Sequence, residues 1–380
     1  MPSQESHPGA LAHIIEDVIA PGAAAVDAAG TFPRKQVDAL ARAGLLGLTV
    51  PAEFGGGGAG PREAADVVRE LGAACGSTAM IVTMHYAATA ALVAAGMNDP
   101  LTEIADGRHL STLAFSESGS RSHFWAPLST AAETGGENVR LDARKSWVTS
   151  AGQADSYVWS SLPLAADGPM TLWLVPGRGD GLRVAGTFDG LGLRGNASAP
   201  MSADGLRVPR GAMIGADGAG LDLALSAVLP VFLIGSAAMS AGLMRRLADE
   251  TAAHLRRTRL EHLGQNLAQR ELPRAELARL RIEADRAWAL IEHALTAVEQ
   301  GRPEAQLLVL EVKAAAGEAA ADAADLALRT CGGAAFRKES PVERLFRDSR
   351  AARVMAPTTE ALHDFIGRAL CGLPLLGDAA

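Results

Sequence analysis

The sequence predicts an α+β protein in which helices come first, strands follow, and helices return at the end. Three observations support this order. Apolar residues recur with the helical period through the first hundred residues, and they do so again beyond residue 221. Between these regions lie short alternating or apolar segments that glycine and proline separate, as in antiparallel β structure. We therefore expect an N-terminal helical domain at residues 1–112, a middle antiparallel β domain at 113–220, and a C-terminal domain resembling a four-helix bundle at 221–380.

The N-terminal domain is expected to be helical from Ala10 to about Gly107. Two amphipathic faces mark its first helices, and they consist of Ile14, Ile15, Val18 and Ile19, and of Val37, Leu40, Leu45 and Leu46. Further helices are predicted at residues 62–71 and 77–95. Residues 51–58, which read Pro-Ala-Glu-Phe-Gly-Gly-Gly-Gly, interrupt the pattern and are predicted to form a loop.

The middle and C-terminal domains differ in the period of their apolar residues. Strands are expected at Leu113–Phe115, Val139–Asp142, Ser156–Ser160 and Thr171–Val175. Long helices of a bundle are expected at Leu223–Thr258, Arg274–Glu299 and Ala305–Arg329.

Composition excludes several classes of protein. The formal net charge of −8 argues against a general nucleic-acid binder. Three cysteines are scattered without metal-ligand spacing, so we expect reduced thiols and no metal site: Cys75, Cys331 and Cys371. The polar start leads into no apolar run of signal length. The apolar stretch Leu223–Ala238 is broken by Ser226 and Pro230 and is expected to be too short for a membrane span. We expect a cytoplasmic protein without a membrane partner.

Short blocks carry the chemistry of the chain. Residues 115–122 read Phe-Ser-Glu-Ser-Gly-Ser-Arg-Ser, and residues 145–152 read Lys-Ser-Trp-Val-Thr-Ser-Ala-Gly. A third block, at residues 191–196, reads Leu-Gly-Leu-Arg-Gly-Asn and is followed by Val208-Pro209.

A fourth block lies near the C-terminus. It contains Cys-Gly-Gly-Ala-Ala-Phe at residues 331–336, Pro-Val-Glu-Arg-Leu-Phe-Arg-Asp at 341–348, and Thr-Thr-Glu at 358–360. In this order the four blocks resemble the acyl-CoA dehydrogenase family, and together they span most of the chain beyond residue 110. The resemblance implies an FAD flavoprotein that acts on an acyl-CoA thioester.

The resemblance assigns roles to the first two blocks. Phe115 and Ser116 would contact the flavin ring, and Ser122 would meet the CoA arm of the substrate. Trp147 would pack on the isoalloxazine, for which an indole provides a flat apolar wall. The Thr149 hydroxyl would lie near flavin N5, where it can donate or accept a hydrogen bond.

The resemblance also assigns FAD contacts to the C-terminal domain. Gly332 and Gly333 would let the FAD pyrophosphate of another subunit approach the backbone, since no Cβ intervenes. Arg329 stands where the family has Gln, and Arg259 is displaced from the usual pyrophosphate-binding arginine. Thr358 ends the triplet that corresponds to Glu-Gly-Thr in many members. A homodimer or homotetramer is implied.

The usual catalytic glutamate is missing from the sequence. Ala356-Pro357-Thr358 replaces the Glu-Gly-Thr triplet, and the second position used in the family corresponds to Leu229–Phe232, which offers no proton acceptor. A positioned base contributes roughly 10²–10⁴ to a rate. Its loss therefore bears directly on the reaction.

Three residues are candidates for a replacement base. Glu360 lies four residues after Ala356, on nearly the same face of a helix. His123 follows Ser122 and could titrate near neutral pH. His85, in the helix at residues 77–95, is expected to face the acyl cavity. For each the alternative is structural: an ordinary helix residue for Glu360, a polar role for His123, and a buried, hydrogen-bonded ring for His85.

Three functions remain open from the sequence. The favoured one is an O2-using oxygenase or oxidase, because both base positions are empty. The second is α,β-dehydrogenation with Glu360 or His123 as the base and an electron-transfer flavoprotein as acceptor. The third is a catalytically idle flavin-binding protein. The acyl group, and the choice between CoA and a carrier protein, stay open.

Overall fold

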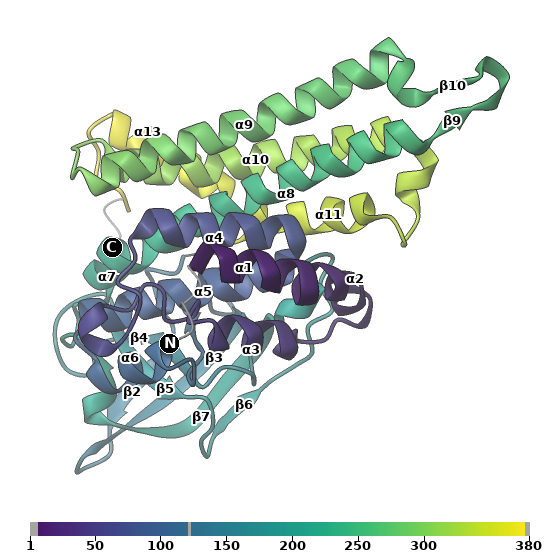
Figure 1. Cartoon of the computed structure of the whole chain (residues 1–380). Helices are drawn as coiled ribbons and strands as arrows, with labels where there is room; N and C mark the ends of the chain where they lie inside the picture. Colours follow the sequence, from purple (N-terminus) through teal and green to yellow (C-terminus); the bar gives the residue numbers. More distant parts are fainter. Residues whose placement is uncertain (1–6, 121–122, 377–380) are drawn as a thin grey trace.

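The computed structural model describes residues 7–120 and 123–376, and it confirms the α+β fold class. Figure 1 shows the N-terminal helices between the β domain and the long C-terminal helices. The N-terminal helices are α1 (His7–Ile14), η1 (Ile15–Ile19), α2 (Ala20–Ala29), α3 (Arg34–Arg42), η2 (Ala52–Phe54), α4 (Pro61–Ala74), α5 (Gly76–Ala94) and α6 (Asn98–Ala105).

The predicted loop at residues 51–58 is present apart from the single turn of η2. A Cβ on Gly56 would lie 2.2 Å from the Val50 carbonyl oxygen, so this close approach of two backbone segments requires glycine. The prediction that Val37, Leu40, Leu45 and Leu46 share one helix face is wrong for the last two residues. α3 stops at Arg42, and Leu45 and Leu46 are buried in the following turns.

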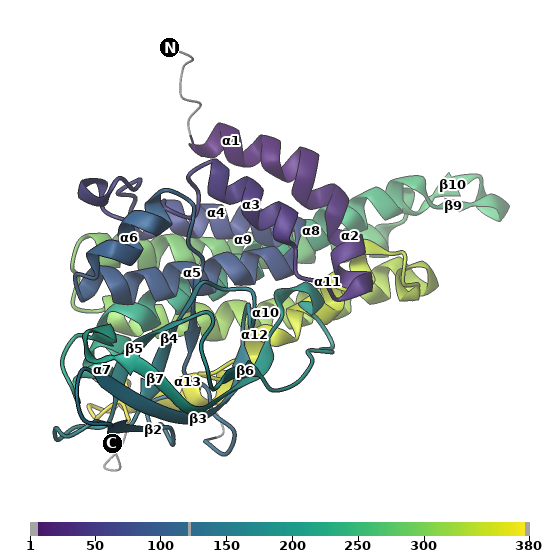
Figure 2. The same cartoon turned by 90° about the horizontal axis from the view of Figure 1, so that it is seen from below.

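The β domain consists of two four-stranded sheets, which Figure 2 shows on one side of the helices. Their orders are β1-β4-β5-β8 and β2-β3-β7-β6. The strands are β1 (Ser111–Ala114), β2 (Thr130–Glu133), β3 (Asn138–Val148), β4 (Ser156–Ser161), β5 (Thr171–Pro176), β6 (Leu182–Val184), β7 (Ala199–Pro209) and β8 (Met213–Ile214). Two short helical turns also belong here: η3 (Arg194–Asn196) and η4 (Arg210–Ala212).

One strand pair departs from the predicted antiparallel arrangement. β1 and β4 are parallel, whereas the other ladders of the two sheets are antiparallel. The chain passes through β2 and β3 of the second sheet before it returns as β4, and such a long crossover permits parallel pairing. Tyr157, Trp159 and Trp173 are fully buried in the core of this domain.

The C-terminal domain contains the longest helices. They are α7 (Gly220–Leu223), η5 (Ala224–Val228), α8 (Leu229–Arg257), α9 (Glu271–Glu299), α10 (Ala305–Cys331), η8 (Gly332–Phe336), α11 (Pro341–Ser349), α12 (Ala351–Val354) and α13 (Thr359–Leu370). A hairpin between α8 and α9 projects beyond the rest of the chain (Figure 1). It comprises β9 (Arg259–Leu260), η6 (Glu261–Leu263), β10 (Gln265–Asn266) and η7 (Leu267–Gln269).

A π-helical turn precedes α8. Proline has no N–H, so Pro230 cannot donate to the carbonyl oxygen of Ser226. The backbone widens over η5, where the Leu229 N–H donates to the Ala224 carbonyl oxygen five residues earlier. This turn lies directly against the cavity described below.

By length and composition, three helical stretches could cross a membrane: His7–Ala29, Gly76–Ala94 and Gly220–Arg257. The prediction that residues 223–238 are too short is therefore wrong, because helix continues through Pro230 to Arg257. Of the most apolar window in each stretch, 17%, 78% and 67% is buried inside the protein. α8 packs against α4, α5, α9 and α10, so most of its apolar surface belongs to the core.

One buried cluster joins the three domains. The Arg347 guanidinium of α11 donates to the Asp27 carboxylate of α2 at 2.8 and 2.6 Å and to Glu343 at 2.8 and 2.7 Å. The neighbouring Asp348 accepts a hydrogen bond from the Leu193 N–H at 2.6 Å. Burial raises the pKa of Asp348 to about 6.

Candidate functional site

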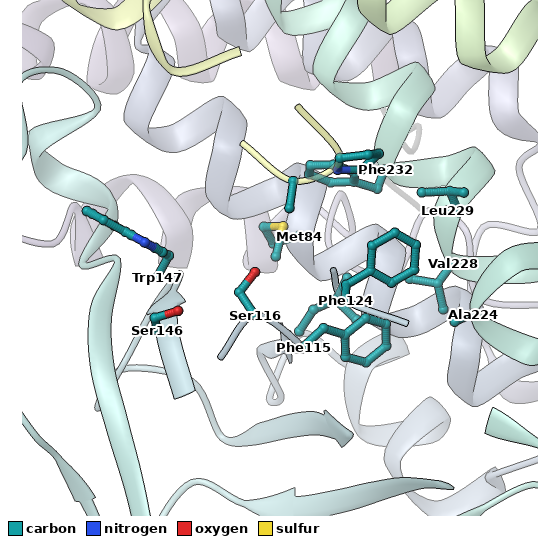
Figure 3. A pocket seen from close by; sticks show the side chains of 13 residues that line it. Met84, Phe115, Ser116, Phe124, Ser146, Trp147, Ala224, Val228, Leu229 and Phe232 are labelled. Carbon is teal, nitrogen blue, oxygen red and sulfur yellow. The ribbon is translucent and has the colours of Figure 1, made fainter. Parts of the chain in front are cut away.

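A small cavity lies where α5, β1, β3, η5 and the start of α8 meet the segment before α13 (Figure 3). Its volume is about 70 Å³. Apolar side chains form most of its wall, and it is lined by Met84, Leu113, Phe115, Ser116, Phe124, Ser146, Trp147, Ala224, Val228, Leu229, Phe232, Ala356 and Pro357. The structure thus brings together residues from the first two sequence blocks with Ala356 and Pro357, which directly precede the Thr-Thr-Glu segment of the fourth.

Trp147 is held in an unusual conformation. The register of β3 against β7 shifts between Lys145 and Val148, and Trp147 has a φ of 57°. Such left-handed backbone costs of order 1–3 kcal/mol for a bulky residue and is concentrated at functional sites. The indole is nevertheless 69% exposed, and it extends away from the phenyl rings of the cavity (Figure 3). An exposed, strained, flat side chain fits the stacking face of a flavin.

Two hydroxyl-bearing segments flank this indole. Ser116 and Ser146 both line the cavity, and the Ser146 N–H donates to the Ser116 carbonyl oxygen at 2.9 Å. Thr149 is buried, and its Oγ1 lies 3.1 Å from the Ser198 hydroxyl. Ser122 lies outside the described residues.

The sequence reasoning missed the ion pair that fixes these two segments. Lys145 donates to Glu117, and both side chains are nearly inaccessible, at 0% and 2% exposed. Lys145 also donates to the Ser160 carbonyl oxygen at 2.7 Å, and the Glu117 carboxylate accepts from the Ser129 hydroxyl at 2.5 Å. Burial lowers the pKa of Lys145 to about 8, and Glu117 acts in the opposite direction. The signal was present in the motifs, because Glu117 directly follows Ser116 and Lys145 stands two residues before Trp147.

The cavity offers no proton acceptor of the usual kind. None of its lining residues, within the described part of the chain, has a carboxylate, imidazole or amine. Ala356, which the sequence comparison by motif aligned with the usual glutamate, lies in the wall. At the second position Leu229 and Phe232 line the cavity, whereas Val231 lines a separate apolar cavity of about 410 Å³ on the other side of η5.

His85 does not face the cavity, contrary to expectation. It is fully buried, its Nε2 lies 3.1 Å from the Leu46 carbonyl oxygen, and its Nδ1 accepts from the Ser111 N–H at 3.1 Å. Burial lowers the pKa of His85 to about 4. Successive residues of a helix point about 100° apart, so Met84 lines the cavity while His85, the next residue of α5, points toward Leu46 and Ser111.

Glu360 and His123 lie near the cavity but do not line it. Glu360 is exposed in the first turn of α13. Its own backbone amide and the Thr358 hydroxyl lower its pKa by hydrogen bonding. His123 has Nδ1 2.8 Å from the Ser120 carbonyl oxygen and stacks edge-on with Trp125, with ring centroids 4.9 Å apart.

The remaining predicted FAD contacts lie elsewhere in the chain. Arg259 is in the projecting hairpin, where it pairs with Glu261 at 3.5 Å, and Arg329 is exposed near the end of α10. Gly332 and Gly333 follow α10, and a Cβ on either would meet no atom within 4 Å. Thr358 caps α13 by accepting from the Ala361 N–H at 3.3 Å.

These observations fit FAD. Trp147 presents an open stacking surface, Ser116 a hydroxyl at the cavity, and the glycine pair a backbone that a phosphate can approach. None of the residues from the hairpin or the glycine pair lines the cavity beside Trp147.

The family models agree with this architecture. Residues 2–100, 112–206 and 218–371 match the acyl-CoA dehydrogenase N-terminal, middle and C-terminal domains respectively. The probable acyl-CoA dehydrogenase YngJ of Bacillus subtilis is 28% identical over 364 residues, which cover 93% of each chain.

Two solved structures extend the comparison. Butyryl-CoA dehydrogenase from Megasphaera elsdenii has a TM-score of 0.90 at 20% identity and covers 98% of both chains. FkbI, described for biosynthesis of the methoxymalonyl extender unit of the Fk520 polyketide, has a TM-score of 0.84 at 27% identity and covers 96% of this chain and 99% of its own. The chain therefore belongs to the acyl-CoA dehydrogenase family of FAD-dependent oxidoreductases.

Proposed function

We propose that this enzyme oxidises a small acyl thioester with O2 as the electron acceptor, and that it does so without a carboxylate base in the acyl cavity. One observation carries this proposal: the cavity beside the flavin-side residues has no ionisable side chain in its described wall. Removal of an α proton during α,β-dehydrogenation needs an acceptor at that place. An oxidation that begins at another atom of the acyl group does not need a proton acceptor at that place.

FAD supplies two-electron redox chemistry and reactivity toward O2 when it is bound. The residues of this chain position the reactants. Trp147 offers the stacking wall, and the Ser116 hydroxyl is available as a hydrogen-bond donor or acceptor. Phe124 and Phe232 make the opposite side apolar, which excludes water from the reacting atoms.

The size of the cavity supports a short acyl group. At about 70 Å³ it holds only a few heavy atoms before side chains must move. The name of FkbI links this fold to an acyl unit with an oxygen substituent, so oxygenated short acyl groups belong in the substrate panel. Thioesters of CoA and of a carrier protein should both be tried.

A second candidate is α,β-dehydrogenation with Glu360 or His123 as a relocated base. The dehydrogenase names of YngJ and of the Megasphaera elsdenii enzyme favour it. An electron-transfer flavoprotein would then accept the electrons. A third candidate is a flavin-binding protein that no thioester reduces.

Anaerobic titration of the FAD-loaded protein with acyl thioesters separates these functions. We expect the correct thioester to bleach the flavin without oxygen in the double variant Glu360→Gln/His123→Asn as well as in the wild type, and we expect air to reoxidise the flavin with steady oxygen uptake, because O2 accepts the two electrons. Bleaching that is lost in the double variant Glu360→Gln/His123→Asn would instead establish dehydrogenation. An absence of both bleaching and oxygen uptake across the panel would favour the idle protein.

We further propose that FAD bridges two subunits of a homo-oligomer. Support comes from the separation of the two predicted FAD-binding sets, since Arg259, Gly332 and Gly333 do not line the cavity at Trp147. A second copy of the chain could supply the distant set.

Met84 should limit acyl length. Its side chain points into the cavity (Figure 3), so Met84→Ala removes a wall and lets a longer chain enter. We expect the ratio of kcat/KM for hexanoyl over butyryl thioesters to rise about tenfold, as a pocket change of one or two methylenes allows. Met97→Ala, which alters a methionine outside the cavity, serves as the matched control. An unchanged ratio in Met84→Ala would place the acyl group elsewhere.

A further inference from the structure

A buried lysine holds the segment that forms one wall of the cavity. Lys313, on α10, is 1% exposed. Its Nζ donates to the carbonyl oxygens of Ala352 at 3.0 Å, Met355 at 3.2 Å and Pro357 at 2.8 Å. A lysine ammonium has three protons, and this one uses all of them on a single stretch of backbone.

The three acceptor carbonyls lie close in the chain to the residues that form the cavity wall. Ala352 lies in α12, and its carbonyl is one of the helix-end groups that has no partner within a four-residue helix. Met355 and Pro357 stand on either side of Ala356. Ala356 and Pro357 themselves line the cavity. The lysine therefore fixes the backbone of this wall from behind.

The groups around Lys313 shift its pKa in opposite directions. Burial lowers its pKa to about 7, while the carboxylate of Glu360 in the first turn of α13 acts in the opposite direction. The three carbonyl oxygens also favour the ammonium form, because they accept from it. Replacing a buried charge that has several hydrogen bonds leaves those acceptors without partners.

We propose that Lys313 is a positioning residue for the acyl group. It acts by holding the backbone of Ala356 and Pro357 in place, so that these two residues form a fixed wall of the cavity. It touches neither substrate nor flavin. The inference rests on the proposed thioester function, and it adds a determinant of acyl binding in place of the missing glutamate.

Lys313→Met tests the clamp, by which we mean the three hydrogen bonds from Lys313 to the backbone of residues 352–357, because it keeps an aliphatic side chain and removes all three N–H donors. Amide hydrogen exchange of the FAD-loaded protein is measured first. We expect exchange at Met355, Ala356 and Thr358 to accelerate at least tenfold in the variant. Unchanged exchange at these amides would overturn the proposal. Lys35→Met, which alters an exposed lysine of α3, is the control.

Binding of two probes then tests the acyl role. Kd values for butyryl-CoA and for free CoA are taken from the change that each causes in the flavin spectrum. We expect Lys313→Met to weaken butyryl-CoA about tenfold and to leave free CoA unchanged, since only the acyl group meets the wall. Equal weakening of both would mean a general structural defect and would overturn the proposal.

A gentler variant covers the case in which Lys313→Met does not fold. Lys313→Gln keeps two N–H donors without the charge, so it should restore part of the exchange protection and part of the acyl-dependent affinity. Exchange and affinity equal to those of the wild type would show that the wall needs no third donor, against the proposal. If neither probe perturbs the wild-type flavin, the thioester function fails, while the exchange measurement still decides the clamp.

Discussion

Replacing Lys145 by Met is expected to lower the free energy of unfolding by about 3–5 kcal/mol, the cost of leaving one member of a buried ion pair alone. Glu117 would keep its buried charge, with the Ser129 hydroxyl and two backbone N–H groups as its remaining donors. Because Ser116 and Trp147 lie beside this pair, we also expect the variant to retain less FAD. Urea denaturation gives the free energy, and the ratio of flavin to protein absorbance gives the occupancy.

A neighbouring ion pair on the same strand supplies the control. Arg144 pairs with Asp204 in solvent, with its side chain 61% exposed. Arg144→Met should cost less than about 1 kcal/mol, as exposed pairs generally do. The double variant Lys145→Met/Glu117→Gln should recover part of the loss, since no buried charge remains. Equal losses in Lys145→Met and Arg144→Met would refute a structural role for the buried pair.

Asp348 should make stability depend on pH in a direction opposite to that of most carboxylates. Its pKa is raised from 3.8 to about 6 by burial, so the folded protein binds a proton between these pH values that the unfolded chain does not. The stabilisation is complete below about pH 4 and is lost as the pH rises through 6. A shift of this size corresponds to about 3 kcal/mol.

Asp348→Asn isolates this contribution. An amide oxygen can still accept from the Leu193 N–H, but it carries no charge at any pH. We therefore expect the unfolding free energy of the variant minus that of the wild type to rise by about 3 kcal/mol between pH 4 and pH 7. Asp189→Asn, which removes a carboxylate that is 83% exposed, should show a change below about 1 kcal/mol. A difference that is flat or falls with pH would mean that Asp348 is charged in the folded state throughout.

Periodicity and motifs predicted the parts of the molecule that depend on local sequence. The long helices α9 and α10 begin and end within three residues of the predicted bounds because their apolar stripes are regular. The residues around them singled out Ser116 and Trp147, and both line the cavity. The four predicted strands overlap β1, β3, β4 and β5, since each contains a short apolar or alternating run between turns, whereas β2, β6, β7 and β8 were not predicted.

Contacts between distant segments were not predictable in the same way. Lys145 and Glu117 are 28 residues apart and meet because a β-bridge sets their register. Lys313 donates to carbonyls about forty residues later in the sequence, and no pattern in the sequence of α10 predicts these contacts. His85 was misplaced by one helical step, because its helix is buried on nearly every side and has no amphipathic stripe to orient it.

The length and apolarity of α8 have a consequence for synthesis. This helix emerges from the ribosome before α9 and α10, the later helices that cover it, and only α4 and α5 among its main partners precede it. A nascent chain therefore exposes an apolar helix until some seventy further residues have been added. Since transiently exposed apolar surface promotes aggregation, we expect the yield of soluble protein to depend on chaperones that bind the chain at this stage.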